Sequence, residues 1–225
     1  MEASPVPASI RSFDLPGPAG VLEALLNPGQ DDAPYCALVC HPHPMGGGTL
    51  HNKVVYRAMK ALQSLGFPVL RFNFRGVGRS EGQHGNGHGE QDDVHAALDW
   101  LENEFHRPIL FAGFSFGANV GMRACCGDRR VPGLIALGLP VVAEGRHYSY
   151  RYLPSCGQPK LFISGDHDPY GPVAEVEAVV ATTPEPKQMV WIQDADHFFV
   201  GKLDQVQAEI IRWVKHNFPA GGPSK

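Results

Sequence analysis

The chain has 225 residues, of which 43% are hydrophobic and 19% are charged, a balance typical of a globular protein with a sizeable core. Its formal net charge of −4 and its pI near 6.2 provide no basic field, so we expect no nucleic-acid partner. No apolar run approaches the roughly 20 residues that a membrane-spanning helix needs, so we expect no membrane span.

The first third of the chain predicts a sheet edge and then a buried strand. Residues 10–27 alternate weakly and are broken at 16–20, which favours an antiparallel edge hairpin. Residues 36–40 (CALVC) are continuously apolar, as is typical of a strand buried on both faces. A helix should follow, with apolar residues at helical spacing and Gly66 at its end.

The loop directly after residues 36–40 reads HPHPMGGG, from His41 to Gly48. Two prolines remove backbone donors and three glycines allow close backbone approach. A loop after an early strand is where an oxyanion donor is expected in an enzyme with a nucleophile elbow. His43 is the first candidate for the donated N–H because it lies two residues past the strand end, and Met45 is the alternative. With no third ligand nearby, the His-x-His pair does not predict a metal site.

Residues 67–74 (FPVLRFNF) predict another strand, and the glycines that follow resemble a dinucleotide-binding loop. The third glycine, Gly82, lies one residue too late for G-x-G-x-x-G, so we expect no nucleotide cofactor. Residues 82–90 are polar and rich in glycine, which indicates a loop near the site in which His84 and His88 are solvated. A helix is expected over about 90–105.

The most informative segment is 108–121, PILFAGFSFGANVG. A short apolar strand from Ile109 to Gly113 leads through G-x-S-x-G into a helix, which is the pattern of a nucleophile elbow. The sharp turn strains the backbone of Ser115 and leaves room only for glycine two residues before and after it. If Ser115 is a nucleophile, an acid and then a histidine should follow, each after a later strand.

The acid is expected after the strands at 134–139 and 160–164. Residues 141–159, between those strands, are too few for a helical lid, so we expect an open, shallow pocket with Tyr148, Tyr150 and Tyr152 as candidates for its rim. The second strand ends in GDHDP, which offers Asp166 and Asp168. We favour Asp168 because it lies further along the loop, and we expect Asp166 to form the turn.

The histidine is expected after the last strand, at residues 189–192. His197 stands there, 29 residues after Asp168 and before a final amphipathic helix. In the expected mechanism, His197 takes the hydroxyl proton of Ser115 as the Ser115 oxygen attacks an acyl carbonyl, and Asp168 fixes the imidazole tautomer. The backbone N–H groups of Phe116 and His43 would bind the oxyanion. The apolar walls of the pocket should come from four phenylalanines: Phe114, Phe116, Phe198 and Phe199.

Taken together, the segments HPHPMGGG, FNFRGVGRSEG, GFSFG, GDHDP and DADHFF resemble the α/β-hydrolases, and in particular the small lidless serine esterases close to the dienelactone hydrolases. The likeness runs from about residue 10 to 218. It implies an α/β fold with a mostly parallel sheet of about eight strands, helices on both faces and no substantial lid domain. Dienelactone hydrolases use cysteine at the elbow, whereas this chain has Ser115, which favours ordinary ester chemistry without a cofactor.

The expected enzyme is therefore a serine carboxylesterase that cleaves short-chain esters of small molecules. Acyl transfer, thioester or amide cleavage by the same triad, and a non-catalytic binding protein on this fold, are the alternatives. We expect one domain over residues 1–225, with frayed ends at about 1–9 and 219–225; a homodimer is left open. The N-terminus lacks a secretory signal pattern, and the five cysteines suit buried free thiols, so a cytoplasmic location is expected.

Overall fold

The computed structural model describes residues 9–143, 145–146 and 148–219. The ends expected to fray lie almost entirely outside the described residues. The described chain forms one sheet of eight strands, in the order β1-β2-β4-β3-β5-β6-β7-β8. The strands are β1 Arg11–Gly17, β2 Gly20–Asn27, β3 Cys36–Cys40, β4 Val69–Phe72, β5 Ile109–Phe114, β6 Gly133–Leu137, β7 Lys160–Gly165 and β8 Lys187–Ile192.

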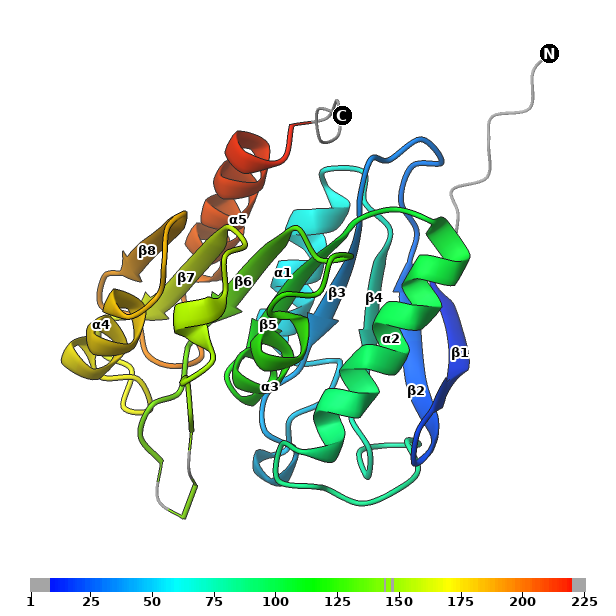
Figure 1. Ribbon diagram of the computed structural model, residues 1–225, viewed down its shortest axis with the longest axis horizontal. Coiled ribbons are helices and arrows are strands. Elements are labelled where there is room, and N and C mark those ends of the chain that lie inside the picture. Colours follow the sequence, from blue (N-terminus) through cyan, green and yellow to red (C-terminus); the bar gives the residue numbers. More distant parts are fainter. Residues whose placement is uncertain (1–8, 144, 147, 220–225) are drawn as a thin grey trace.

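The sheet is parallel from β4 to β8 and antiparallel only at the β1–β2 hairpin and its junction with β4. The expected edge hairpin and mostly parallel sheet are thus confirmed. Each parallel strand is followed by a crossover that returns the chain to the same end of the sheet. Consequently the loops after β3, β5, β7 and β8 all emerge at the carboxyl edge (Figure 1).

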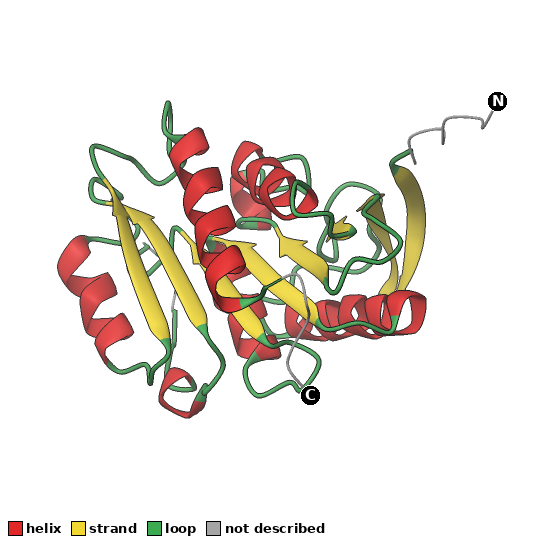
Figure 2. Cartoon of the chain, turned by 90° about the horizontal axis from the view of Figure 1, so that it is seen from above, coloured by secondary structure: helices red, strands yellow, loops and turns green. Residues whose placement is uncertain are grey.

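Five helices cover the two faces of the sheet within the described residues, as Figure 2 shows. They are α1 Lys53–Gln63, α2 Gly89–Phe105, α3 Phe116–Cys125, α4 Val173–Ala181 and α5 Leu203–Asn217. Apolar side chains of α1 and α5 belong to one core cluster, and those of α2, α3 and α4 belong to a second. Two cores separated by a central sheet are the expected arrangement for an α/β protein with helices on both faces.

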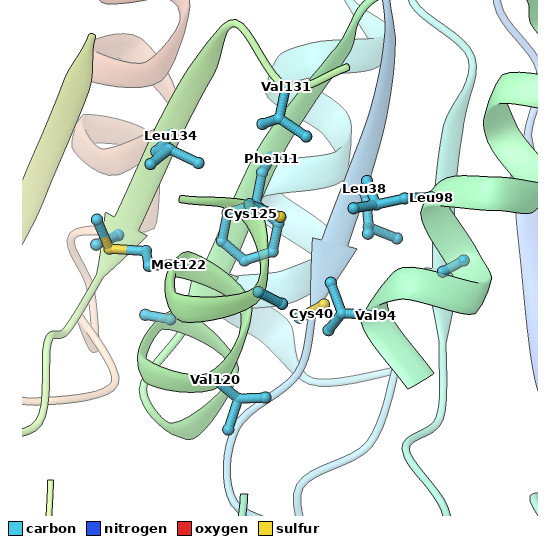
Figure 3. Close-up of a cluster of buried hydrophobic side chains, with 14 of the residues drawn as sticks. Leu38, Cys40, Val94, Leu98, Phe111, Val120, Met122, Cys125, Val131 and Leu134 are labelled. Atoms are coloured by element: carbon cyan, nitrogen blue, oxygen red, sulfur yellow. The ribbon is translucent and has the colours of Figure 1, made fainter. Parts of the chain in front are cut away.

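The core under α2 and α3 holds the elbow strand in place. Phe111 of β5 packs among Leu38 and Cys40 of β3, Val94 and Leu98 of α2, and Met122 of α3 (Figure 3). All of these side chains are buried, and the ring of Phe111 approaches so closely that a Cβ on Gly121 would lie 2.1 Å from its Cζ atom. The strand that carries the candidate nucleophile is therefore fixed by dense packing.

Strand β4 is shorter than the strand that the sequence predicts over 67–74. Pro68 has no N–H to donate to a neighbouring strand. At the other end, the Phe74 N–H donates to Nε2 of His41 at 3.0 Å instead of extending the ladder. The apolar character of the segment reflects burial of Phe67 and Phe74 outside the strand.

The cysteines are free thiols, as expected: four are buried and Cys126 is half-buried. Among the described residues there is no helix with the length and apolar character to cross a membrane.

Candidate active site

Ser115 lies at the turn between β5 and α3, with φ 55° and ψ −118°. A positive φ is rare for a residue other than glycine and marks a backbone held under strain by its surroundings. The flanking glycines make this turn possible: a Cβ on Gly113 would lie 2.5 Å from the carbonyl oxygen of Gly117. The local structure is therefore the strand–turn–helix elbow that the G-x-S-x-G pattern predicts.

Three side chains from separate loops form a continuous chain of hydrogen bonds at the carboxyl edge of the sheet. Nε2 of His197 lies 2.9 Å from Oγ of Ser115, and Nδ1 of His197 lies 2.7 Å from Oδ2 of Asp168. The three residues are only 3–6% exposed. Because burial removes competing water, these hydrogen bonds keep the imidazole in a fixed orientation between the hydroxyl and the carboxylate.

Asp168 is held by its own loop. Its Oδ1 accepts the backbone N–H of Tyr170 at 2.8 Å and that of Gly171 at 3.2 Å, which leaves Oδ2 for His197. Asp166 points elsewhere and accepts the N–H of Ala195 at 3.3 Å. The two loops can meet because Gly165 lacks a Cβ, which would lie 2.1 Å from the Ala195 carbonyl oxygen.

The backbone N–H groups of Phe116 and His43 each have no hydrogen-bond partner among the described residues. Phe116 is the first residue of α3, so its N–H is one of those that a helix leaves unpaired at its amino end. The N–H of Met45, by contrast, already donates to Nδ1 of the His43 ring at 3.1 Å. Of the two N–H groups that the sequence left open, that of His43 is thus the one without a partner among the described residues.

The loop from His41 to Gly48 is brought against the elbow by close backbone packing. A Cβ on Gly117 would lie 2.5 Å from the carbonyl oxygen of His41, so the amino end of α3 touches the end of β3. The rings of His43 and Phe116 pack with centroids 4.7 Å apart. Glycine at position 117 therefore allows the loop that carries the His43 N–H to pack directly against the amino end of α3.

His41 itself is buried and connects this loop to β4. Its Nε2 accepts the Phe74 N–H, so the proton of the neutral ring resides on Nδ1, which donates to the Pro42 carbonyl oxygen at 2.7 Å. Burial lowers the pKa of His41 to about 4, because a protonated ring would be desolvated and would lose the bond from Phe74.

This pKa shift predicts acid sensitivity of the fold. Between pH 6.5 and about 4 the unfolded chain binds a proton at His41 that the folded chain does not, so stability is full above 6.5 and falls as the pH drops. His41→Gln should reduce the loss of unfolding free energy between pH 7 and pH 4.5 by about 2–3 kcal/mol. Urea unfolding at both pH values measures this difference, and an equal loss in both proteins would contradict it.

A cavity of about 130 Å³ opens beside Ser115 and His197. One wall is the loop 42–48 with Asn52, and the other is formed by Pro140, Arg146, Tyr148, Tyr170 and Phe198. Such a small volume is below the range usual for sites that enclose a drug-sized ligand. Arg146 and Tyr170 were not singled out in the sequence, although Tyr170 stands only two residues after Asp168 and packs on the His197 ring.

The aromatic residues expected around the pocket are divided by the structure. Tyr148 lines the cavity, but Tyr150 is buried and donates its hydroxyl to the Pro140 carbonyl oxygen at 2.6 Å. Tyr152 does not line the cavity either, because it packs against the core under α3. The prediction that these two tyrosines form the rim is wrong.

Among the four phenylalanines, only Phe198 lines the cavity, with 49% of its surface exposed. Phe114 and Phe199 are fully buried, and Phe114 packs on His197 with ring centroids 5.0 Å apart. Phe116 lies under the ring of His43. The prediction of four apolar walls is therefore wrong for all but Phe198, because the other three rings do not line the cavity.

The loop 82–90 packs beside the elbow. His88 is exposed, as expected, whereas His84 is half-buried against Phe116 and His43, so the prediction of a solvated His84 is wrong. Nδ1 of His84 lies 2.7 Å from Oε1 of Glu90, which also accepts the Gly85 N–H. Within the described ranges, no three His, Cys, Asp or Glu side chains are grouped where they could hold a metal ion.

Comparison with known proteins places this geometry in a family. The model of the alpha/beta hydrolase domain family matches residues 36–215. An uncharacterized protein of Rickettsia prowazekii is 36% identical over 201 residues, which are 86% of this chain and 84% of that protein.

Two solved structures are also similar to the chain. An alpha-beta serine hydrolase homologue from Coxiella burnetii is 37% identical with a TM-score of 0.81, over 90% of this chain and 96% of the other. A serine hydrolase without a lid from Xanthomonas campestris is 32% identical with a TM-score of 0.82, over 98% of both chains. The family model covers most of the sequence and both solved serine hydrolases share the fold over nearly the whole chain, so the chain belongs to the alpha/beta hydrolase family.

Proposed function

We propose that this protein is a carboxylesterase-type serine hydrolase that cleaves short-chain esters through an acyl-enzyme formed on Ser115. The observation that carries the proposal is the unbroken contact chain from Ser115 Oγ through His197 to Asp168, at 2.9 and 2.7 Å. Its distances suit a nucleophile, a general base and an orienting carboxylate. A serine hydroxyl alone is too weak a nucleophile at neutral pH, so the adjacent base supplies the activation.

In the first step, Ser115 Oγ attacks the ester carbonyl carbon while Nε2 of His197 takes the hydroxyl proton. Asp168 accepts the Nδ1–H of His197 and stabilises the imidazolium that forms. The tetrahedral intermediate collapses as His197 returns the proton to the leaving alcohol oxygen. Water then attacks the acyl-enzyme, with His197 as base again, and releases the acid and free Ser115.

The negative charge of each tetrahedral intermediate develops on the former carbonyl oxygen. In the proposal, the N–H groups of Phe116 and His43 bind that oxygen, and the amino end of α3 adds the positive end of its dipole. Removing one such donor in other enzymes costs about 3–4 kcal/mol of transition-state stabilisation. Burial lowers the pKa of the His43 ring to about 4, so the ring stays neutral beside this charge at working pH.

Substrate size is the first test of the proposal. Because the cavity encloses about 130 Å³, p-nitrophenyl esters with acyl chains of about two to four carbons should be hydrolysed with the highest kcat/KM. Longer chains would project into solvent and gain little further apolar burial. A series from two to sixteen carbons, compared with Ser115→Ala as background, measures this preference. A preference for twelve carbons or more would contradict it.

Two further proposals concern the domain organisation of the chain and its location in the cell. We propose one domain, since both core clusters pack against the same sheet. We also propose a cytoplasmic location, supported by five free cysteine thiols, four of them buried, of the kind that persist in reducing compartments.

A further inference from the structure

The cavity beside Ser115 contains one permanently charged side chain, Arg146. Apart from the site residues themselves, the other lining groups are glycines, prolines, aromatic rings and Asn52. His43 carries no charge near neutral pH because burial, and next to it the charge of Arg146, hold its pKa at about 4. Because Arg146 and His43 line the same cavity and the charge of Arg146 lowers the His43 pKa, a ligand bound in this cavity also lies within the range of the Arg146 charge.

No carboxylate among the described residues neutralises Arg146. Six other arginines each form an ion pair with an acidic side chain: Arg11, Arg57, Arg75, Arg79, Arg130 and Arg212. Arg146 is also half-buried, and it lines the same cavity as two tyrosines, Tyr148 and Tyr170. A guanidinium partly withdrawn from water gains most from a planar anion that accepts two of its N–H groups.

The sign of this charge contrasts with that of the whole chain. The formal net charge is −4, so an anionic substrate is repelled on average by the protein surface. The positive charge of Arg146 in the cavity wall instead attracts an anionic substrate once that substrate has reached Ser115. The distance dependence of the Coulomb interaction makes the effect specific for a charge held near the reacting ester.

We propose that Arg146 binds a carboxylate carried by the substrate, so that this hydrolase prefers esters with a carboxylate a few atoms from the ester group. The proposal rests on the proposed function, because it assigns the substrate class of the same site. Arg146 acts by positioning and selection, and it does not take part in the acyl-transfer steps.

The test uses two pairs of esters that differ only in charge. Mono-p-nitrophenyl glutarate and its methyl ester place the carboxylate on the acyl half, and 4-acetoxybenzoate and its methyl ester place it on the leaving group. We expect the wild-type protein to hydrolyse the anionic member of one pair with about tenfold higher kcat/KM. Arg146→Gln should abolish that preference, so that the anionic and neutral members of each pair have kcat/KM values within about twofold of each other.

Arg151→Gln is the matched control, because Arg151 is exposed and lines a separate groove. It should retain the wild-type preference, and 0.5 M NaCl should weaken the preference in both proteins. A wild-type ratio at or below one in both pairs, or a ratio that Arg146→Gln leaves unchanged, would overturn the assignment.

A binding measurement separates this proposal from the proposed function. In the Ser115→Ala background, calorimetric titration needs no turnover, and its two ligands are monomethyl glutarate, a methyl-ester analogue of the first anionic substrate, and 4-hydroxybenzoate, the phenol product of the second. Adding Arg146→Gln to Ser115→Ala should raise the Kd of one ligand about tenfold. If this second substitution leaves the Kd of both ligands unchanged, the role of Arg146 is overturned. If wild type and Ser115→Ala hydrolyse the esters at equal rates and the Kd still rises with Arg146→Gln, ester hydrolysis on Ser115 is refuted while anion binding by Arg146 is supported.

Discussion

Ser115→Ala should lower kcat/KM for p-nitrophenyl acetate by at least about 10,000-fold. The substitution removes the only atom that would form the acyl bond, whereas binding and the unpaired N–H groups of Phe116 and His43 stay in place. Initial rates with purified protein, corrected for spontaneous hydrolysis, measure the loss. Circular dichroism and urea unfolding should show an intact fold, because only a hydroxyl with one contact to His197 is lost.

Ser164→Ala is the matched control for this loss. Ser164 is also a buried serine; it lies on β7, and its hydroxyl has no hydrogen-bond partner among the described residues. Its substitution should leave kcat/KM within about threefold of wild type, as is usual for a change that removes no catalytic contact. Activity of Ser115→Ala within tenfold of wild type would contradict the role assigned to Ser115.

Asp168→Asn should lower kcat by about 10,000-fold while preserving the fold. Oδ1 of residue 168 must still accept the N–H groups of Tyr170 and Gly171, so the amide nitrogen would face Nδ1 of His197. An NH₂ group donates to Nδ1, which moves the imidazole proton to Nε2. In that tautomer Nε2 cannot take the proton of Ser115, and the nucleophile is no longer activated.

Asp166→Asn provides the comparison for Asp168. Asp166 contacts the Ala195 N–H through Oδ1 at 3.3 Å, and an asparagine oxygen can accept the same bond. Its kcat should therefore stay within about fivefold of wild type. Equal losses in the two variants would mean that charge near the loop, rather than the tautomer of His197, limits the reaction.

Local constraints made most of the fold predictable from the sequence. The elbow could be located because only glycine fits at 113 and 117, where a Cβ would meet backbone atoms at 2.5 Å. Continuous apolar runs such as residues 36–40 indicated buried parallel strands, and the sheet confirms them. Once Ser115 was placed, chain order and strand ends were enough to point to Asp168 and His197.

The details that failed depend on tertiary contacts without a local pattern. The aromatic run around Tyr150 has no periodicity, and only the folded chain shows that its hydroxyl reaches the Pro140 carbonyl oxygen. His84 lies in a polar, glycine-rich segment, yet its ring packs against Phe116, which is distant in sequence, and its Nδ1 lies beside Glu90 of α2. Arg146 is one of several charges in a polar loop, and its position in the cavity wall depends on how that loop folds back.

The most direct test of the account is the mass of the protein after reaction with a fluorophosphonate probe. Attack by Ser115 Oγ forms a P–O bond and releases fluoride, and His197 takes the hydroxyl proton. We predict one probe-derived mass increment, confined to the peptide that contains Ser115 and absent from Ser115→Ala and His197→Ala. An unmodified wild-type protein, or an increment on another residue that persists in Ser115→Ala, would contradict the account.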